Sequence, residues 1–218
     1  MYALVCLILL VAAGGGAQDT NDAMAFLQKA KSKASSLKSW RAEIVETAQM
    51  SANGMDLQSK VRTKIAVQAP MKMRRENSGD DQTLLVCDGT ESFYTGDGHN
   101  YYRNPVRVNQ DCEFPMRSSY QLAEGLVTIS LVAHDHVVLM DGSHACDVLR
   151  AEWKGAVRTM CIDPMSGLIL RDITEINKDG VRSTRTATFT SYEGDPTFSP
   201  DLFKFSIPPG ALEAKPPI

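Results

Sequence analysis

Apolar and polar residues alternate along most of the chain from Trp40 onward, which is the pattern of strands with one buried face. The first two alternating runs, at 40–50 and 56–68, are separated by Asn53-Gly54, a strong signal for a two-residue hairpin turn. Further strand-like runs lie at 71–76, 83–88, 91–95, 100–104, 136–140, 145–153, 156–162, 168–177, 181–192 and 202–207. About a dozen strands joined by short turns predict an antiparallel meander, and the accumulated twist of so wide a sheet predicts that it curls towards a barrel.

One segment before the strands has the period of a helix. Thr20, Asn21 and Asp22 are residues that cap helix N-termini, and an apolar stripe at helical spacing follows them. The stripe consists of Ala23, Leu27, Ala30, Ala34 and Leu37. We therefore expect an amphipathic N-terminal helix of about four turns that packs its stripe on the sheet.

A second segment, Ser118 to His136, also departs from alternation. Leu122, Leu126 and Ile129 recur in it at helical intervals. We expect a helix or helical loop here that crosses over the curled sheet. Such a lid would enclose apolar space between itself and the sheet.

The first residues have the character of a secretory signal peptide. Residues 1–18 carry no charge, Leu4 to Ala13 are apolar, and Gly15-Gly16-Ala17 offer small residues for cleavage. The apolar run is shorter than the roughly 20 residues that a membrane span needs. We predict a signal peptide at 1–17 and a single exported domain at 18–218.

The charges do not favour a polyanionic partner. The chain has 23 Lys and Arg and 26 Asp and Glu, interspersed, with a formal charge of −3. This balance provides no strong field to attract nucleic acid or an anionic membrane. Nucleic acid is therefore not an expected partner.

Four cysteines remain once Cys6 is removed with the signal peptide, and an even number in an exported chain predicts disulfides. Cys146 and Cys161 flank a hairpin with Lys154-Gly155 at its turn. A four-residue loop would place the two cysteines directly opposite, and a two-residue loop would make them diagonal neighbours on the same face. We predict a Cys146–Cys161 disulfide, and by elimination a Cys87–Cys112 disulfide.

Several segments resemble the periplasmic lipoprotein carrier superfamily, the LolA-like proteins and their outer-membrane lipoprotein-sorting relatives. They are "LQKAKSKASSLKSWRAEIVET", "LLVCDGTESFYTGDGHNYY", "DPMSGLILRD" and "SPDLFKFSIPPGA", in the same order over nearly the whole mature chain. The lipoprotein-sorting carriers have an arginine before the proline that ends an early strand. Here Ala69 precedes Pro70, so the role of that arginine in lid opening is not carried over.

The resemblance implies an α+β fold in which a strongly curved antiparallel sheet, an incomplete β-barrel, wraps round an N-terminal helix under a helical lid. It further implies a monomeric, non-catalytic periplasmic carrier without a cofactor, which contacts a membrane or membrane protein transiently. The expected ligand is a lipid or an acylated lipoprotein. By apolar character and face, the residues expected to line the acyl cavity are Ile44, Ile65, Leu126, Ile129, Leu131 and Phe189.

Two other functions compete with the carrier. An envelope protein-interaction or sensor module could use the same scaffold. A metal-dependent hydrolase could use His134 and His136, which would share a face of a strand, with Asp141 or His144 nearby. The chain contains no HExxH, G-x-S-x-G, G-x-G-x-x-G or Walker motif, so we expect neither an enzyme nor a metal site.

Overall fold

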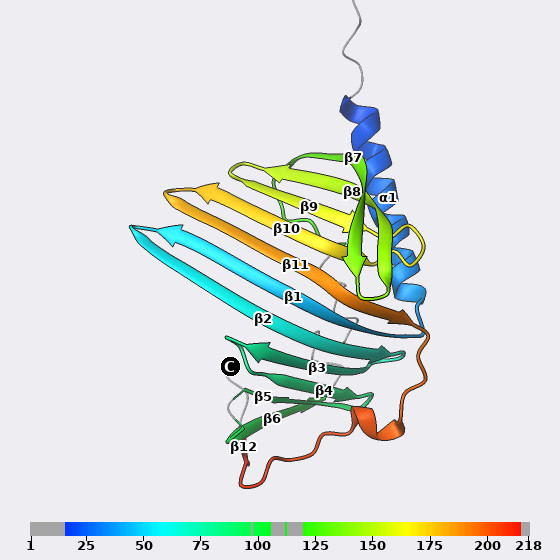
Figure 1. Cartoon of the computed structure of the whole chain (residues 1–218), viewed down its shortest axis with the longest axis vertical. Helices are drawn as coiled ribbons and strands as arrows, with labels where there is room; N and C mark the ends of the chain where they lie inside the picture. The colour runs from blue at the N-terminus through cyan, green and yellow to red at the C-terminus, as the bar shows by residue number, and fades with distance from the viewer. Residues whose placement is uncertain (1–15, 97, 106–111, 113–119, 215–218) are drawn as a thin grey trace, which may run out of the picture.

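A wide antiparallel sheet with one long helix makes up most of the structure (Figure 1). The computed structural model describes residues 16–96, 98–105, 112 and 120–214. The helices are α1 (Gly16–Ser36) and the 3-10 helix η4 (Pro200–Phe203). The strands are β1 (Ser39–Ala52), β2 (Met55–Gln68), β3 (Lys72–Gly79), β4 (Leu84–Asp88), β5 (Glu91–Thr95), β6 (Asn100–Pro105), β7 (Leu126–Leu139), β8 (Gly142–Trp153), β9 (Ala156–Ile162), β10 (Ile169–Lys178), β11 (Val181–Gly194) and β12 (Leu212–Ala214).

The twelve strands form one sheet in the order β12-β6-β5-β4-β3-β2-β1-β11-β10-β9-β8-β7. Neighbouring strands are antiparallel, except that β12 runs parallel to β6. The strands β12 and β7 lie at opposite ends of this order and do not pair with each other. The expected curved, unclosed antiparallel sheet is therefore confirmed.

The hairpin turns form where the sequence predicts them. Asn53 and Gly54 join β1 to β2 with positive φ values of 52° and 76°, a conformation that asparagine and glycine tolerate. Asp179 and Gly180 join β10 to β11 in the same way, with φ of 53° and 79°. The first of these turns sets the register of β1 with β2, from Ser39 opposite Gln68 to Ala52 opposite Met55.

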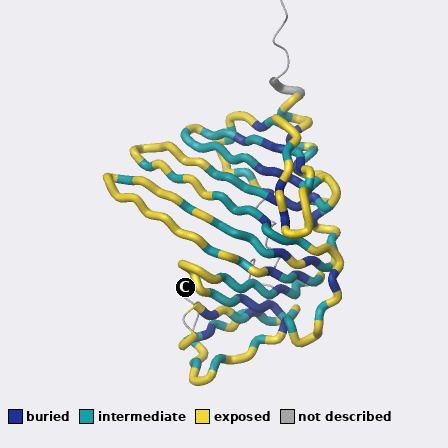
Figure 2. The backbone as a smooth tube through the Cα atoms, in the orientation of Figure 1, coloured by how far each residue is buried: buried dark blue, intermediate teal, exposed yellow. Residues whose placement is uncertain are grey.

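One face of the sheet carries the large buried side chains Trp40, Ile65, Leu149, Met160 and Phe189, and we call it the inner face. Of the predicted helical stripe, Ala23, Leu27, Ala30 and Ala34 are buried in the same hydrophobic cluster, whereas Leu37 follows the end of α1 and is partly buried. In Figure 1, α1 lies along the β7–β8 end of the sheet. Figure 2 shows that burial is greatest near α1 and in β4, whereas the tips of the β1–β2 and β10–β11 hairpins are exposed.

The helix begins earlier than its sequence predicts. α1 is already helical at Gly16, so Thr20, Asn21 and Asp22 lie inside it and do not cap it. Asp19 is in the first turn, where a carboxylate is favoured by the helix dipole. The predicted cleavage point after Ala17 falls in this first turn, and residues 1–15 lie outside the described part. α1, the one long helix of the described residues, lacks the apolar length needed to cross a membrane.

The prediction of a helical lid over Ser118 to His136 is wrong for most of that segment, because Leu126 to Leu139 form β7. The strand is irregular between Leu126 and Thr128 and between Leu131 and Ala133. Each irregularity shifts the register by one residue, so buried residues no longer alternate and the strand imitates a helical period. Residues 113–119 lie outside the described part.

The predicted strand at 202–207 is also wrong. Pro200 to Phe203 form η4, whose N-cap Ser199 accepts a hydrogen bond at its Oγ from the backbone N–H of Asp201. Proline is favoured at the start of a helix because it has no N–H to satisfy there.

Both cysteine pairs are disulfide-bonded in the structure. Cys146 and Cys161 have Cα atoms 5.4 Å apart, and those of Cys87 and Cys112 are 5.9 Å apart. Lys154-Gly155 form a two-residue loop, since Trp153 pairs with Ala156. Cys161 therefore faces Val148, and the cysteines are diagonal neighbours.

The turn between β9 and β10 packs tightly against α1. Gly167 has φ +77°, and a Cβ added to it would lie 2.2 Å from the carbonyl oxygen of Ala30. Gly180 has a similar φ of +79° but no atom within 4 Å of its added Cβ. The two glycines therefore share a backbone conformation and differ in their contact with the helix.

We expect Gly180→Ala to lower the free energy of unfolding by about 1 kcal/mol, the cost of a positive φ. Gly167→Ala should lower it by about 2 kcal/mol more, because the new methyl group pushes α1 away from the turn. Urea unfolding followed by circular dichroism measures both values. Equal losses in the two variants would contradict the tight docking of α1 on this turn.

Candidate functional site

Charged side chains cross the middle of the inner face from β3 to β9. The register shows this: Glu46 and Asp172 both face Ala187, and Asp172 also faces Met160, so all four share the inner face. The charged residues on this face are Arg75 of β3, Glu46 of β1, Arg185 of β11, Asp172 of β10 and Arg158 of β9. We call these five residues the charged belt.

Two ion pairs use four of the five belt residues. Arg185 donates from Nε and Nη2 to the two carboxylate oxygens of Glu46, both at 2.6 Å. Arg158 donates from Nε and Nη2 to Asp172 at 2.9 and 2.6 Å. The hydrogen bond to Glu46 raises the pKa of Arg185. The Arg158 and Asp172 side chains are each only 14% exposed, so this pair is well shielded from water.

Arg75 is the exception in the belt. Its Nε is buried and has no hydrogen-bond partner among the described residues. Its cross-strand neighbours are Ile65 on β2 and Leu85 on β4, both apolar and buried. The belt thus contains three guanidinium groups and two carboxylates, and the surplus positive charge belongs to Arg75.

A pocket of about 180 Å³ lies between the belt and the core, and we call it the base pocket. It is smaller than a typical ligand pocket of roughly 300–1,000 Å³. Its polar lining consists of Thr63 and four residues of the charged belt, Arg75, Glu46, Asp172 and Arg185. Its apolar lining consists of Trp40, Ile44, Ile65, Ile169, Ala187 and Phe189.

A second pocket, of about 670 Å³, lies towards the hairpin tips, and we call it the tip pocket. A row of inner-face residues lines it across six strands: Leu57, Met50, Ser183, Ile176, Ala156 and Trp153. Polar residues next to this row complete the lining, among them Gln49, Asp56, Gln58, Glu175 and Arg182. Met50, Leu57 and Ile176 are 40%, 57% and 40% exposed, an arrangement of apolar side chains that marks contact surfaces for apolar partners. The inner face therefore has apolar surface on both sides of the charged belt.

The strands β6 and β7 follow each other in the described part of the chain but lie far apart in the strand order. Cys112, which lies between them in the sequence, is bonded to Cys87 on the inner face. Further on, the buried Tyr120 donates from its hydroxyl to the carbonyl oxygen of Gly167 at 2.5 Å, and burial raises the pKa of this tyrosine. Trp153 Nε1 donates to the carbonyl oxygen of Ala123 at 3.0 Å.

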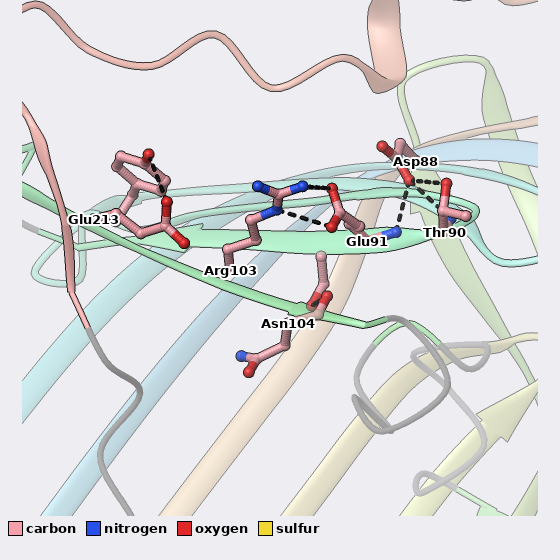
Figure 3. A network of polar contacts seen from close by, with 8 residues as sticks. Asp88, Thr90, Glu91, Arg103, Asn104 and Glu213 are labelled. Atoms are coloured by element: carbon pink, nitrogen blue, oxygen red, sulfur yellow. Dashed lines mark hydrogen bonds and ion pairs between the residues drawn. The ribbon is translucent and has the colours of Figure 1, made fainter.

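The opposite face near β4, β5 and β6 is covered by the C-terminal segment. Phe205 stacks on Phe93 with ring centroids 5.0 Å apart, and Tyr101 donates to Glu213 at 3.2 Å. Arg103 donates from Nε and Nη2 to Glu91 at 2.8 and 2.7 Å (Figure 3). These contacts fasten β12 to the sheet and give this face a structural role.

Asp88 belongs to the same polar network (Figure 3). Partial burial of this carboxyl acts to raise its pKa. Hydrogen bonds from the backbone N–H groups of Glu91 and Thr90 outweigh this effect and lower the pKa below its usual value. Three hydrogen bonds, from the backbone N–H groups of Thr90 and Glu91 and from the hydroxyl of Thr90, end on its Oδ1 and fix the turn between β4 and β5.

The structure brings three of the predicted cavity residues together. Ile44, Ile65 and Phe189 line the base pocket. Leu126, Ile129 and Leu131 lie instead on β7, at the edge of the sheet. Ile129 is buried in the core, Leu126 packs against the core, and Leu131 is 46% exposed.

The charged belt was not predicted, although the sequence contains a signal for it. Along β1, the inner-face positions Trp40, Ala42 and Ile44 are apolar, and Glu46 interrupts the series. A carboxylate on an otherwise apolar face needs a partner, so it predicts a nearby cation. The partner, Arg185, comes from β11, which the sequence does not identify as the neighbour of β1.

The histidine cluster does not form a metal site within the described residues. No group of three or more His, Cys, Asp or Glu side chains in that part of the chain is placed to hold a metal ion. His134 and His136 share a face of β7, and His134 Nδ1 lies 2.6 Å from a carboxylate oxygen of Asp147. Asp135 forms an ion pair with Arg171, and its pKa is lowered by the backbone N–H of His136 and by this arginine.

Comparison with solved structures gives several matches over most of the chain, at low sequence identity. An uncharacterized conserved protein from Thermus thermophilus is 12% identical with a TM-score of 0.52, and the match covers 89% of this chain and 99% of that one. The MucA/MucB complex of Pseudomonas aeruginosa matches at 19% identity and a TM-score of 0.46, over 85% of this chain. This chain spans only 61% of the length of that protein.

A domain from Vibrio parahaemolyticus assigned to outer-membrane lipoprotein sorting also matches, at 7% identity and a TM-score of 0.36, over 84% of this chain and 97% of that one. No family model and no curated protein match the sequence. The match to the Thermus thermophilus protein shows that the fold of this chain is shared with a solved structure.

The shielded ion pair of the belt makes a testable contribution to stability. We expect Asp172→Asn to lower the free energy of unfolding by about 3 kcal/mol, because it leaves Arg158 without a counter-charge in a shielded site. Glu91→Gln, which breaks the more exposed pair with Arg103, should cost less than about 1 kcal/mol. Urea denaturation of both variants measures the difference, and a smaller loss in Asp172→Asn than in Glu91→Gln would contradict it.

Proposed function

We propose that this protein is an exported, non-catalytic binding protein that holds an alkyl chain, from a lipid or an acylated lipoprotein, on the inner face of its open sheet. The observation that carries the proposal is the apolar surface of the inner face, with the base pocket and the tip pocket on either side of the charged belt. Exposed Met50, Leu57 and Ile176 lose unfavourable contact with water when an alkyl chain covers them.

The energetics of alkyl burial suit a carrier. Each buried methylene contributes about 0.8 kcal/mol, so a chain of about 14 carbons gains roughly 10 kcal/mol before the costs of ordering. No bond has to form or break for such a ligand to be taken up and released. The resemblance to LolA-like proteins in sequence supports the same class of ligand.

Export to the periplasm fits the disulfides. Two disulfides in one domain favour an oxidising compartment. A signal peptide at 1–17 and a single mature domain at 18–218 are part of the proposal, as are a monomeric state and a transient contact with a membrane or membrane protein that supplies the ligand.

A substitution that fills the base pocket tests the proposal. Ala187 lines this pocket from β11, and Thr186 beside it points to the opposite face. We expect Ala187→Phe to weaken binding of a dansyl-labelled fatty acid about tenfold, the loss of roughly two buried methylenes. Thr186→Phe, the matched control, should bind like the wild type in a fluorescence titration.

Three results would count against the proposal. One is a wild-type protein that takes up no labelled fatty acid in this titration. Another is an Ala187→Phe variant with unchanged affinity. Native mass spectrometry of the purified protein adds the third: bound zinc without lipid would favour the metal-dependent hydrolase.

A second candidate function, a protein-interaction module, is favoured by the edge position of β7. This strand ends the sheet of the described residues and has exposed apolar side chains. They are Val127, Leu131, Val132 and Val138, at 67%, 46%, 50% and 78% exposure, and Met140 in the turn that follows is 81% exposed. An edge strand with apolar side chains can accept a strand from a protein partner.

Photo-crosslinking in the native envelope tests this second function. A photoreactive residue in place of Val138 should give one discrete protein adduct, because a partner strand would lie against it. The same residue in place of the exposed Lys154, in the β8–β9 turn, should give none. An absence of adducts at both sites, or equal labelling at both, would contradict a partner at this edge.

A further inference from the structure

We propose that Arg75 binds the anionic group, a carboxylate or a phosphate, of an amphiphile whose alkyl chain lies on the inner face. This inference rests on the proposed function and specifies its ligand class. The observations behind it are the pairing of the charged belt, the surroundings of Arg75 and the shape of the base pocket.

The first step is the charge of the belt. Glu46 already accepts two hydrogen bonds from Arg185, and Asp172 accepts two from Arg158. Each carboxylate is thus already paired with one arginine of the belt, and neither pairs with Arg75. Arg75 therefore has a positive charge with no counter-charge among the described belt residues.

The second step is the environment of Arg75. On β3 its inner-face neighbours are Met73, which is fully buried, and Asn77. The amide of Asn77 is occupied, since its Oδ1 accepts from Thr63 at 2.9 Å and its Nδ2 donates to Asp81 at 2.9 Å. A buried guanidinium N–H without an acceptor is costly, and it is retained where a ligand supplies the acceptor.

The third step compares Arg75 with its neighbour in sequence. Arg74 points to the opposite face, where its Nε donates to Glu76 at 2.6 Å. The two arginines share a strand and a residue type, but only Arg75 lies in the base pocket. Arg74 has a carboxylate partner on its face and Arg75 has none among the described residues, so the anionic ligand is assigned to Arg75 on the inner face.

The fourth step is the fit of the ligand. Trp40, Ile44 and Phe189 line the base pocket beside Arg75, so an anionic head group there has apolar surface next to it. The volume of about 180 Å³ holds a head group and its first methylenes. The remaining alkyl chain then extends along the inner face towards the tip pocket. A planar guanidinium matches carboxylate and phosphate oxygens by paired hydrogen bonds.

Isothermal titration calorimetry with three ligands of equal chain length tests the inference: dodecanoate, dodecyl phosphate and dodecanol. The wild type should bind at least one anionic ligand about ten- to a hundredfold more tightly than the alcohol, the value of a charge-assisted hydrogen bond. Arg75→Met should lose this preference and keep its affinity for dodecanol. The better of the two anions identifies the head group as carboxylate or phosphate.

Two further variants complete the design. Arg75→Lys retains the charge and should keep most of the preference, and Arg74→Met, the matched control, should behave like the wild type. The melting temperature of ligand-free Arg75→Met should be unchanged or higher, because the substitution removes an unsatisfied polar group. A fall of more than about 4 °C would give Arg75 a structural role and overturn the inference.

The outcomes separate this inference from the proposed function. Binding of all three ligands with equal affinity leaves the carrier function standing and overturns the role of Arg75. An anion preference that survives in Arg75→Met, or that disappears equally in Arg74→Met, also overturns it. A wild-type protein that binds none of the three ligands overturns both.

Discussion

The pairing of β1 with β11 is the contact on which the rest of the structure depends. This pairing joins two groups of strands: β2, β3, β4, β5 and β6 on one side, and β7, β8, β9 and β10 on the other. The strands β1 and β11 that form it are separated by most of the chain. The register shift between Glu43 and Ile44 brings Phe189 opposite Ile44 and so aligns the two halves of the inner face. Without this alignment, the base pocket and the charged belt would not form.

The same topology explains why the inner face is open. The edge strands β12 and β7 do not meet, so the sheet curves without closing. Between β6 and β7 in the sequence, Cys112 is bonded to Cys87 of the inner face, and Tyr120 donates to Gly167 in the β9–β10 turn. The inner face therefore combines a buried core with apolar side chains, Met50, Leu57 and Ile176, that are exposed towards the hairpin tips.

Charge on an apolar face is tolerated where it is paired, and the belt follows this rule in two of its three arginines. Glu46 with Arg185 and Asp172 with Arg158 form complete bidentate pairs between neighbouring strands. These pairs hold β1 to β11 and β10 to β9 through side chains as well as through the backbone. Arg75 contributes no such link among the described belt residues, which sets it apart as a group available to a ligand.

Much of the fold could be predicted from local sequence. Asn53-Gly54 and Asp179-Gly180 determine their hairpins through backbone conformation, and four of the five predicted stripe residues, Ala23 to Ala34, are buried as their spacing predicts. Only the end of β7, within the predicted run at 136–140, was predicted as a strand, because the two irregularities before it disturb the alternation that identifies a strand. Leu126, Ile129 and Leu131, expected in a helical lid, therefore lie in a strand.

The candidate site was predictable only in part. Ile44, Ile65 and Phe189 could be chosen because apolar residues at alternating positions share a face. The ion pair between Glu46 and Arg185 could not, because it depends on the long-range pairing of β11 with β1.

The most direct test of a ligand on the inner face uses the two tryptophans of the chain. Trp40 lines the base pocket and Trp153 lines the tip pocket. Native mass spectrometry measures the fraction of protein that has bound a fatty acid brominated along its alkyl chain. Tryptophan emission should be quenched in proportion to this fraction. The unbrominated fatty acid should bind without quenching. Stoichiometric binding of the brominated ligand with unchanged tryptophan emission would contradict a ligand on the inner face.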